Sequence, residues 1–236
     1  MQATEYKVLS GLAPLPVSSS AQNNTMTTNT YQPKFYQQER FAWAVLGFIV
    51  LAVVLIVWLA PIEQTIGAAI KYVYVHVAFT RAGIYGFYLA GILGVLITFT
   101  AKKSLQAWTS KIGWVAFLLF LIGGLVSILA QQATWGGNPW FEPRNRMTLN
   151  ILAIGMITLI LADWVPWLRV RGLLYVVLAG FVAWSIPNTP LVLHPGDAIG
   201  SSTSTRIQWV FLLLTWLVIV LGIWIVWYWH GRSQKN

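Results

Sequence analysis

The sequence contains no cysteine, and charged residues of either sign are scarce. The absence of cysteine excludes a disulfide framework, a thiolate metal site, a cysteine nucleophile and an iron–sulfur cluster. Only 9% of the 236 residues are charged, whereas a soluble globular domain has about 25%. An ordinary soluble globule is therefore excluded, and any metal chemistry depends on histidine, aspartate or glutamate.

Hydrophobic residues make up 57% of the chain, its mean hydropathy is +0.67, and it contains 14 tryptophans. Apolar stretches of about 20 residues are long enough to cross a hydrocarbon core of roughly 30 Å as helices. We therefore predict an all-α, polytopic integral membrane protein with six transmembrane helices. The predicted spans cover residues 41–60, 72–100, 112–130, 147–168, 172–187 and 207–229.

The composition changes at both ends of this predicted membrane domain. Residues 1–40 are polar and rich in serine, threonine and asparagine, which predicts a disordered tail. The six-helix membrane domain is expected over residues 41–230. Residues 231–236 are expected to form a second, short tail.

The distribution of lysine and arginine predicts the orientation of the chain. Ten of the 15 basic residues lie in the two tails and in the loops on the same side as the tails. Because cytoplasmic loops carry the excess of basic residues, we predict that both termini are cytoplasmic, in the plasma membrane. The net charge of +9 is then a consequence of orientation, and nucleic acid is not an expected partner.

Two of the three histidines fall on the predicted outer face. His76 lies near the start of the second span, and His194 lies in the last outer loop. Neutral imidazole is a common metal ligand, so these two histidines are the candidate metal-ligating residues. His230 ends the last span among aromatic residues and is expected to lie at the membrane interface.

The middle outer loop, residues 131–146, combines aromatic, glycine, proline and arginine residues in a segment too irregular for the hydrocarbon core. Its aromatic side chains offer a platform for a planar apolar ligand, and arginine pairs bidentately with carboxylates. Lys71, at the start of the second span, is a further candidate, although such a lysine also snorkels to the interface. The candidate binding residues of the loop are Trp135, Gly136, Trp140, Phe141, Glu142 and Arg144.

Haem b meets these requirements. Two histidines can ligate its iron axially, and the aromatic residues can pack on the macrocycle. Lys71, Arg144 or Arg146 would then pair with the propionates.

The same residue types are compatible with two other classes of protein. The two outer histidines with Glu142 or Asp197 would suit a zinc site in a membrane enzyme. Outer histidines would also suit a transporter of a small solute or ion, although the sequence shows no evident internal duplication. No HExxH or GxSxG motif supports a hydrolase.

The order of these features resembles the cytochrome c assembly family of haem-handling membrane proteins, which comprises CcmC, CcmF and CcsA and has a tryptophan-rich WWD domain. The features are the segment Tyr74-Val75-His76-Val77, the Trp-Gly-rich loop after the third span, and a second outer histidine before the sixth span. The resemblance covers residues 41–230 and is strongest to the six-helix CcmC-like haem exporter proteins.

The resemblance implies that haem is bound on the extracytoplasmic face and passed to a haem chaperone similar to CcmE during cytochrome c maturation. It implies His76 and His194 as the axial ligands, with Arg144 placed like the arginine that follows the family's acid. It also implies a small helper subunit and an ABC-type ATPase as partners. The chain would then be a carrier of haem and not an enzyme.

The loop departs from the family pattern, which is close to WGxWWxWD. Asn138 and Pro139 stand in place of the central tryptophan pair. Phe141 replaces the last tryptophan, and Glu142 replaces the aspartate. The departures concern the detailed contacts of the loop with haem.

Other residues of the spans carry structural expectations. Small residues of the second span, Gly83, Gly86 and Gly94, predict close helix packing. Thr80 belongs to a stripe of the same helix that is expected chiefly to pack, and its position also allows a hydrogen bond that would tune His76. Arg81 would lie deeper and face other helices or a water-filled cavity. Asp163 is expected to form a salt bridge with the nearby residues Arg169 and Arg171.

Overall fold

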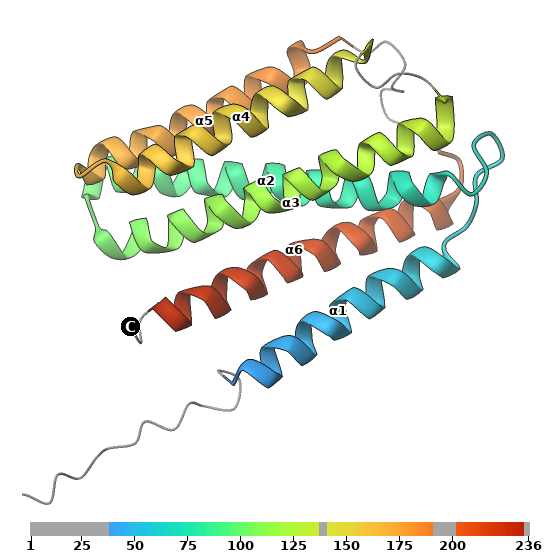
Figure 1. Cartoon of the computed structure of the whole chain (residues 1–236), viewed down its shortest axis with the longest axis horizontal. Helices are drawn as coiled ribbons and strands as arrows, with labels where there is room; N and C mark the ends of the chain where they lie inside the picture. Colours follow the sequence, from blue (N-terminus) through green and yellow to red (C-terminus); the bar gives the residue numbers. More distant parts are fainter. Residues whose placement is uncertain (1–37, 137–140, 191–201, 234–236) are drawn as a thin grey trace, which may run out of the picture. The chain divides into compact units, whose positions relative to one another are not determined.

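The computed structural model of the chain describes residues 38–136, 141–190 and 202–233 (Figure 1). These residues form six α-helices and no β-strand, and every helix is long and apolar enough to cross a membrane. The predicted all-α class and the six apolar spans are therefore confirmed. The helices are α1 (Glu39–Leu59), α2 (Ile70–Thr100), α3 (Lys103–Trp135), α4 (Pro143–Trp164), α5 (Leu168–Asn188) and α6 (Thr205–Ser233).

Several predicted features lie outside the described residues. They include most of the tail over residues 1–40, the end of the second tail, the loop residues Asn138, Pro139 and Trp140, the second candidate ligand His194, and Asp197.

Some helix ends differ from the prediction. The fourth span was expected to reach residue 168, but α4 ends at Trp164 because Val165 precedes Pro166 and has extended backbone angles. Residues 131–135 belong to α3 and residues 143–146 belong to α4. The prediction of an irregular outer loop over residues 131–146 was therefore too long, since only residues 136–142 separate the two helices.

Helix α2 packs against α3 and α5 along lines of small residues. A Cβ atom on Gly86 would lie 2.6 Å from the Cβ of Ala116 in α3, and one on Gly94 would lie 2.6 Å from the carbonyl oxygen of Gly172 in α5. Small residues let helix backbones approach closely where lipid provides no hydrophobic driving force. The predicted close packing at Gly83, Gly86 and Gly94 is confirmed.

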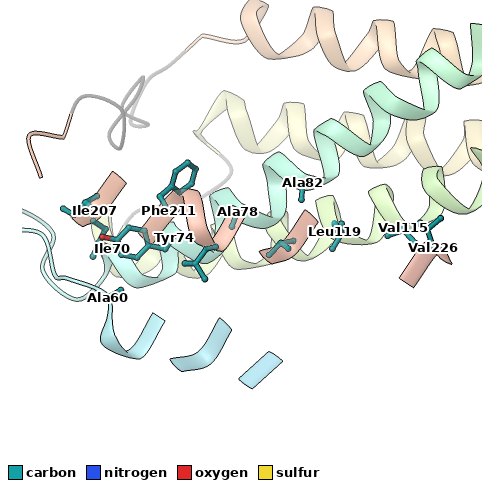
Figure 2. Close-up of a cluster of buried hydrophobic side chains, with 12 residues drawn as sticks. Ala60, Ile70, Tyr74, Ala78, Ala82, Val115, Leu119, Ile207, Phe211 and Val226 are labelled. Atoms are coloured by element: carbon teal, nitrogen blue, oxygen red, sulfur yellow. The ribbon is translucent and has the colours of Figure 1, made fainter. Parts of the chain in front are cut away.

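Two clusters of buried apolar side chains stabilise this arrangement. One joins α2 and α3 to α6 through residues such as Tyr74, Ala78 and Phe211 (Figure 2). The other joins α2 and α3 to α4 and α5, with Phe87 and Phe120 in edge-to-face contact. Helices α2 and α3 contribute to both clusters, so they form the centre of the helical domain.

Successive helices run in opposite directions, so helix ends gather in two groups (Figure 1). Helices α2, α4 and α6 begin at one end of the domain, where α1, α3 and α5 finish, and we call this the α2-start end. At the opposite end, Glu39 of α1 forms a salt bridge of 2.6 Å with Arg232 of α6. The start of α1 and the end of α6 therefore lie on the same side of the domain.

Candidate functional site

His76 lies in the second turn of α2 and is half-buried against α3. Its Nδ1 atom is 2.9 Å from the carbonyl oxygen of Gly123. A carbonyl can only accept a hydrogen bond, so Nδ1 of the neutral ring carries the hydrogen and Nε2 carries the lone pair. Metal-ligating histidines have this arrangement, in which one nitrogen donates to a carbonyl and the other faces the metal.

Thr80, one turn further along α2, also contacts the His76 ring. Its Oγ1 atom lies 3.3 Å from Nδ1, so the predicted contact between these two residues is confirmed. The carbonyl of Gly123 and the hydroxyl of Thr80 together fix the orientation of the imidazole.

The glycine pair Gly123-Gly124 lets α2 and α4 each approach α3 closely, and the approach of α2 is at the level of His76. A Cβ atom on Gly123 would lie 2.7 Å from the backbone nitrogen of Thr80 in α2. A Cβ atom on Gly124 would lie 3.1 Å from Cγ2 of Thr148 in α4. This pair was not among the residues predicted to pack closely, although two adjacent glycines inside an apolar span are a signal of close packing.

Helix α4 presents two of the predicted loop residues at the same end. Glu142 is the N-cap of the helix, is only 1% exposed, and accepts a long hydrogen bond of 3.4 Å from the backbone nitrogen of Arg144. Arg144 lies one turn before Thr148, and its carbonyl accepts a hydrogen bond from the Thr148 hydroxyl at 3.0 Å. The Nε atom of Arg144 is buried and has no hydrogen-bond partner among the described residues.

Hydrogen bonds between the end of α3 and the start of α4 hold the connection between these helices in place. The side-chain amides of Gln131 and Asn145 form two reciprocal hydrogen bonds of 2.7 Å each. Gly136 then ends α3 in the left-handed conformation, with φ of 60°. Trp135 is the last residue of α3. Phe141, directly before the N-cap of α4, is 75% exposed at the α2-start end.

Helix α5 ends before it reaches the level of His76. The backbone of Gly91 in α2 lies against Ala179 in α5, and α5 finishes nine residues later, at Asn188. At about 1.5 Å per residue, the antiparallel α5 extends to about residue 82 of α2, and His76 lies about 9 Å beyond. The segment that contains His194 connects α5 to α6. The last residue of α5 and the first residue of α6 both lie at the α2-start end.

Lys71 is directed away from these groups. Its Nζ atom donates a hydrogen bond of 2.8 Å to the carbonyl oxygen of Trp58 and lies 6.0 Å from the centre of the Trp58 ring. Lys71 therefore ties the start of α2 to the end of α1. His76 and Arg144 therefore lie at the same end of the domain, and the contacts of Lys71 are with α1.

At the opposite end of the domain, Asp163 and His230 each contact a tryptophan of α3. The expected salt bridge of Asp163 is absent from the described part of the chain. Its carboxylate instead accepts hydrogen bonds from Oγ of Ser110 at 2.8 Å and from Nε1 of Trp114 at 2.9 Å. His230 stacks on Trp108, with 3.8 Å between the ring centres.

No model of a known protein family matches the chain, and no curated protein matches it. Within residues 38–136, 141–190 and 202–233, no group of three histidine, aspartate or glutamate side chains lies close enough to hold a metal ion.

Proposed function

We propose that the protein binds haem b at the α2-start end and presents it for cytochrome c maturation. The observation that carries this proposal is the His76 imidazole, held by the Gly123 carbonyl so that Nε2 has the lone pair. An ionisable side chain inside a membrane span is rare, and the usual reason for one is function. His76 lies about 9 Å inside α2, by the rise of 1.5 Å per residue.

The remaining roles follow from the sequence and from the contacts around His76. His194 is the proposed second axial ligand. Arg144, whose buried Nε has no hydrogen-bond partner in the described part of the chain, is the proposed partner of a propionate. The aromatic residues Trp135, Trp140 and Phe141 would pack against the macrocycle.

The proposed mechanism is ligand exchange, without bond-making chemistry by this chain. His76 and His194 hold the iron until an acceptor offers its own ligand, and the exposed Phe141 lies on the surface where the acceptor would approach. The acceptor would be a haem chaperone similar to CcmE, or an apocytochrome. A helper subunit and an ABC-type ATPase are proposed as further partners, as in the family that the sequence resembles.

The positive-inside rule supports an extracytoplasmic position for this site. The basic residues concentrate in the tails and in the loops at the end opposite His76. We accordingly propose that the site faces outward from the plasma membrane and that both termini are cytoplasmic.

The test is an absorption spectrum of the protein purified in mild detergent after expression with haem supplied. We expect a Soret band and low-spin reduced bands in the wild type, weakened or shifted in His76→Ala and in His194→Ala. His230→Ala is the matched control, because His230 stacks on Trp108 at the other end of the domain, and its spectrum should not change.

Absence of haem from well-folded wild-type protein would contradict the proposal, as would unchanged spectra in both variants. Metal analysis of the same samples would then distinguish a zinc site at the histidines from a transporter without bound metal.

A further inference from the structure

Arg81 is a cation inside the apolar part of α2, and the proposed function leaves it without a role. Its guanidinium lies over the ring of Phe211 in α6, 4.5 Å from the ring centre. Within the part of the chain that the structure describes, the Arg81 side chain forms no hydrogen bond and no ion pair. A charged side chain at such depth is costly unless it faces a partner, a ligand or water.

The guanidinium of Arg81 lies closer to the α2-start end than its own backbone does. Long side chains on a helix point toward its N-terminus, which here is the α2-start end. Figure 2 shows the ring of Phe211 at the level of Tyr74 and Ala78, well before Ala82 along α2. Since the guanidinium stacks on this ring, it lies near the level of His76.

His76 and Arg81 flank one face of α2. Five residues at 3.6 per turn place them about 140° apart around the helix. Val73 and Val77 lie on the face between them; both pack against the edge of the cluster that joins α2 and α3 to α6, and both remain half-buried. Helix α5, which covers this side further along α2, ends before it reaches these residues.

The spacing between His76 and the guanidinium of Arg81 suits a flat ligand that carries carboxylates at its edge. An α-helix with side chains is about 10–12 Å across, so two groups about 140° apart on it are separated by roughly 10 Å. This separation is similar to the reach from the centre of a porphyrin to its peripheral carboxylates. The two valines between would contact the apolar macrocycle.

We propose that Arg81 binds a carboxylate of the ligand that His76 ligates, a haem propionate, and that Phe211 holds the guanidinium in place. This inference rests on the proposed function. Arginine suits the role because its planar guanidinium stacks on an aromatic ring and still presents its edge to a carboxylate. Together with Arg144, the site would offer one guanidinium for each of the two propionates.

The experiment compares haem with haem dimethyl ester, which keeps the iron and the macrocycle but has no free carboxylate. Each is titrated into purified wild-type, Arg81→Gln and Arg81→Lys proteins, and binding is followed by the Soret band. We expect Arg81→Gln to weaken haem binding by about 10- to 100-fold, because a charge-assisted bidentate pair is lost. Its affinity for the dimethyl ester should equal that of the wild type.

Arg81→Lys keeps the charge but not the planar fork, so its affinity for haem should lie between those of the wild type and Arg81→Gln. The matched control is Arg206→Gln, which removes an exposed positive charge from the first turn of α6 at the same end. Both ligands should bind this variant as they bind the wild type.

The possible failures are distinguishable. If no protein binds either ligand, the proposed haem function is wrong. If Arg81→Gln binds haem as tightly as the wild type, or loses both ligands equally, the carboxylate role of Arg81 is wrong while haem binding stands. Loss of a co-purified anionic phospholipid from Arg81→Gln, with haem affinity unchanged, would also overturn it and assign the guanidinium to a lipid phosphate.

Discussion

At the scale of single residues, Glu63 organises the connection between α1 and α2 with its own carboxylate. Oε2 accepts hydrogen bonds from the backbone nitrogens of Thr65 at 2.7 Å and of Ile66 at 2.9 Å, and Oε1 accepts one from the Thr65 hydroxyl at 3.1 Å. The turn closes where the backbone nitrogen of Gly67 donates to the Glu63 carbonyl at 2.8 Å. These bonds favour the charged carboxylate.

The pKa of Glu63 is therefore lowered, chiefly by the hydrogen bond from the Ile66 backbone and against a smaller opposing effect of burial. A carboxyl whose pKa is lower in the folded state stabilises its turn above the unfolded pKa and loses this contribution as the pH falls through the folded pKa. We expect the carboxyl carbon of Glu63 in an NMR titration to shift at lower pH than that of an exposed glutamate. Glu63→Gln identifies the signal, and titration at or above the ordinary value would contradict the prediction.

Asp163 shows where sequence reasoning about single residues fails. Its position near Arg169 and Arg171 predicted a salt bridge, but its partners are Ser110 and Trp114, about 50 residues earlier. Contacts between helices depend on which faces meet, and spacing along the chain does not fix this. The contact of Thr80 with His76 was predictable because residues four apart share one face of a helix.

At the scale of the helices, the approach of α2 to α3 at Gly123 positions the imidazole of His76. A Cβ atom on Gly123 would lie 2.7 Å from the backbone nitrogen of Thr80, which is shorter than a van der Waals contact. We expect Gly123→Ala to separate the helices, to destabilise the protein by about 1–3 kcal/mol as overpacking does, and to weaken haem binding. Thermal unfolding in detergent and the Soret band measure the two effects.

Gly180→Ala is the matched control for this substitution. Gly180 lies in α5, and no atom would be within 4 Å of an added Cβ. Alanine in a helix is favoured over glycine by about 0.5–1 kcal/mol, so the variant should be as stable as the wild type or slightly more so. Equal unfolding temperatures for Gly123→Ala and Gly180→Ala would contradict the packing argument.

The helices themselves were largely predictable, because long apolar runs leave few alternatives in a bilayer. Their ends were less so. Residues 131–135 read as loop because they are polar, yet they continue α3, where the side chain of Gln131 is paired with Asn145. This pairing satisfies polar groups that the sequence alone would place in water. By contrast, Pro166 was visible in the sequence and sets the end of α4 near Trp164.

At the scale of the whole membrane domain, the six helices alternate in direction and place Glu39 and Arg232 in one salt bridge. An even number of spans returns the chain to the side where it began. The distribution of basic residues predicts that this side is cytoplasmic. The segment between α1 and α2 and the proposed haem site would then face outward.

Labelling of introduced cysteines tests this orientation without background, because the chain has no cysteine of its own. We expect a membrane-impermeant maleimide to label Gln64→Cys in intact cells, since the exposed Gln64 lies between α1 and α2. Ser233→Cys and Ser104→Cys, both exposed at the opposite end, should be labelled only after the membrane is permeabilised. If all three were labelled in intact cells, the alternation of the helices would be wrong. If the pattern were reversed, the helices would stand but the charge argument would fail, and the proposed haem site would face the cytoplasm.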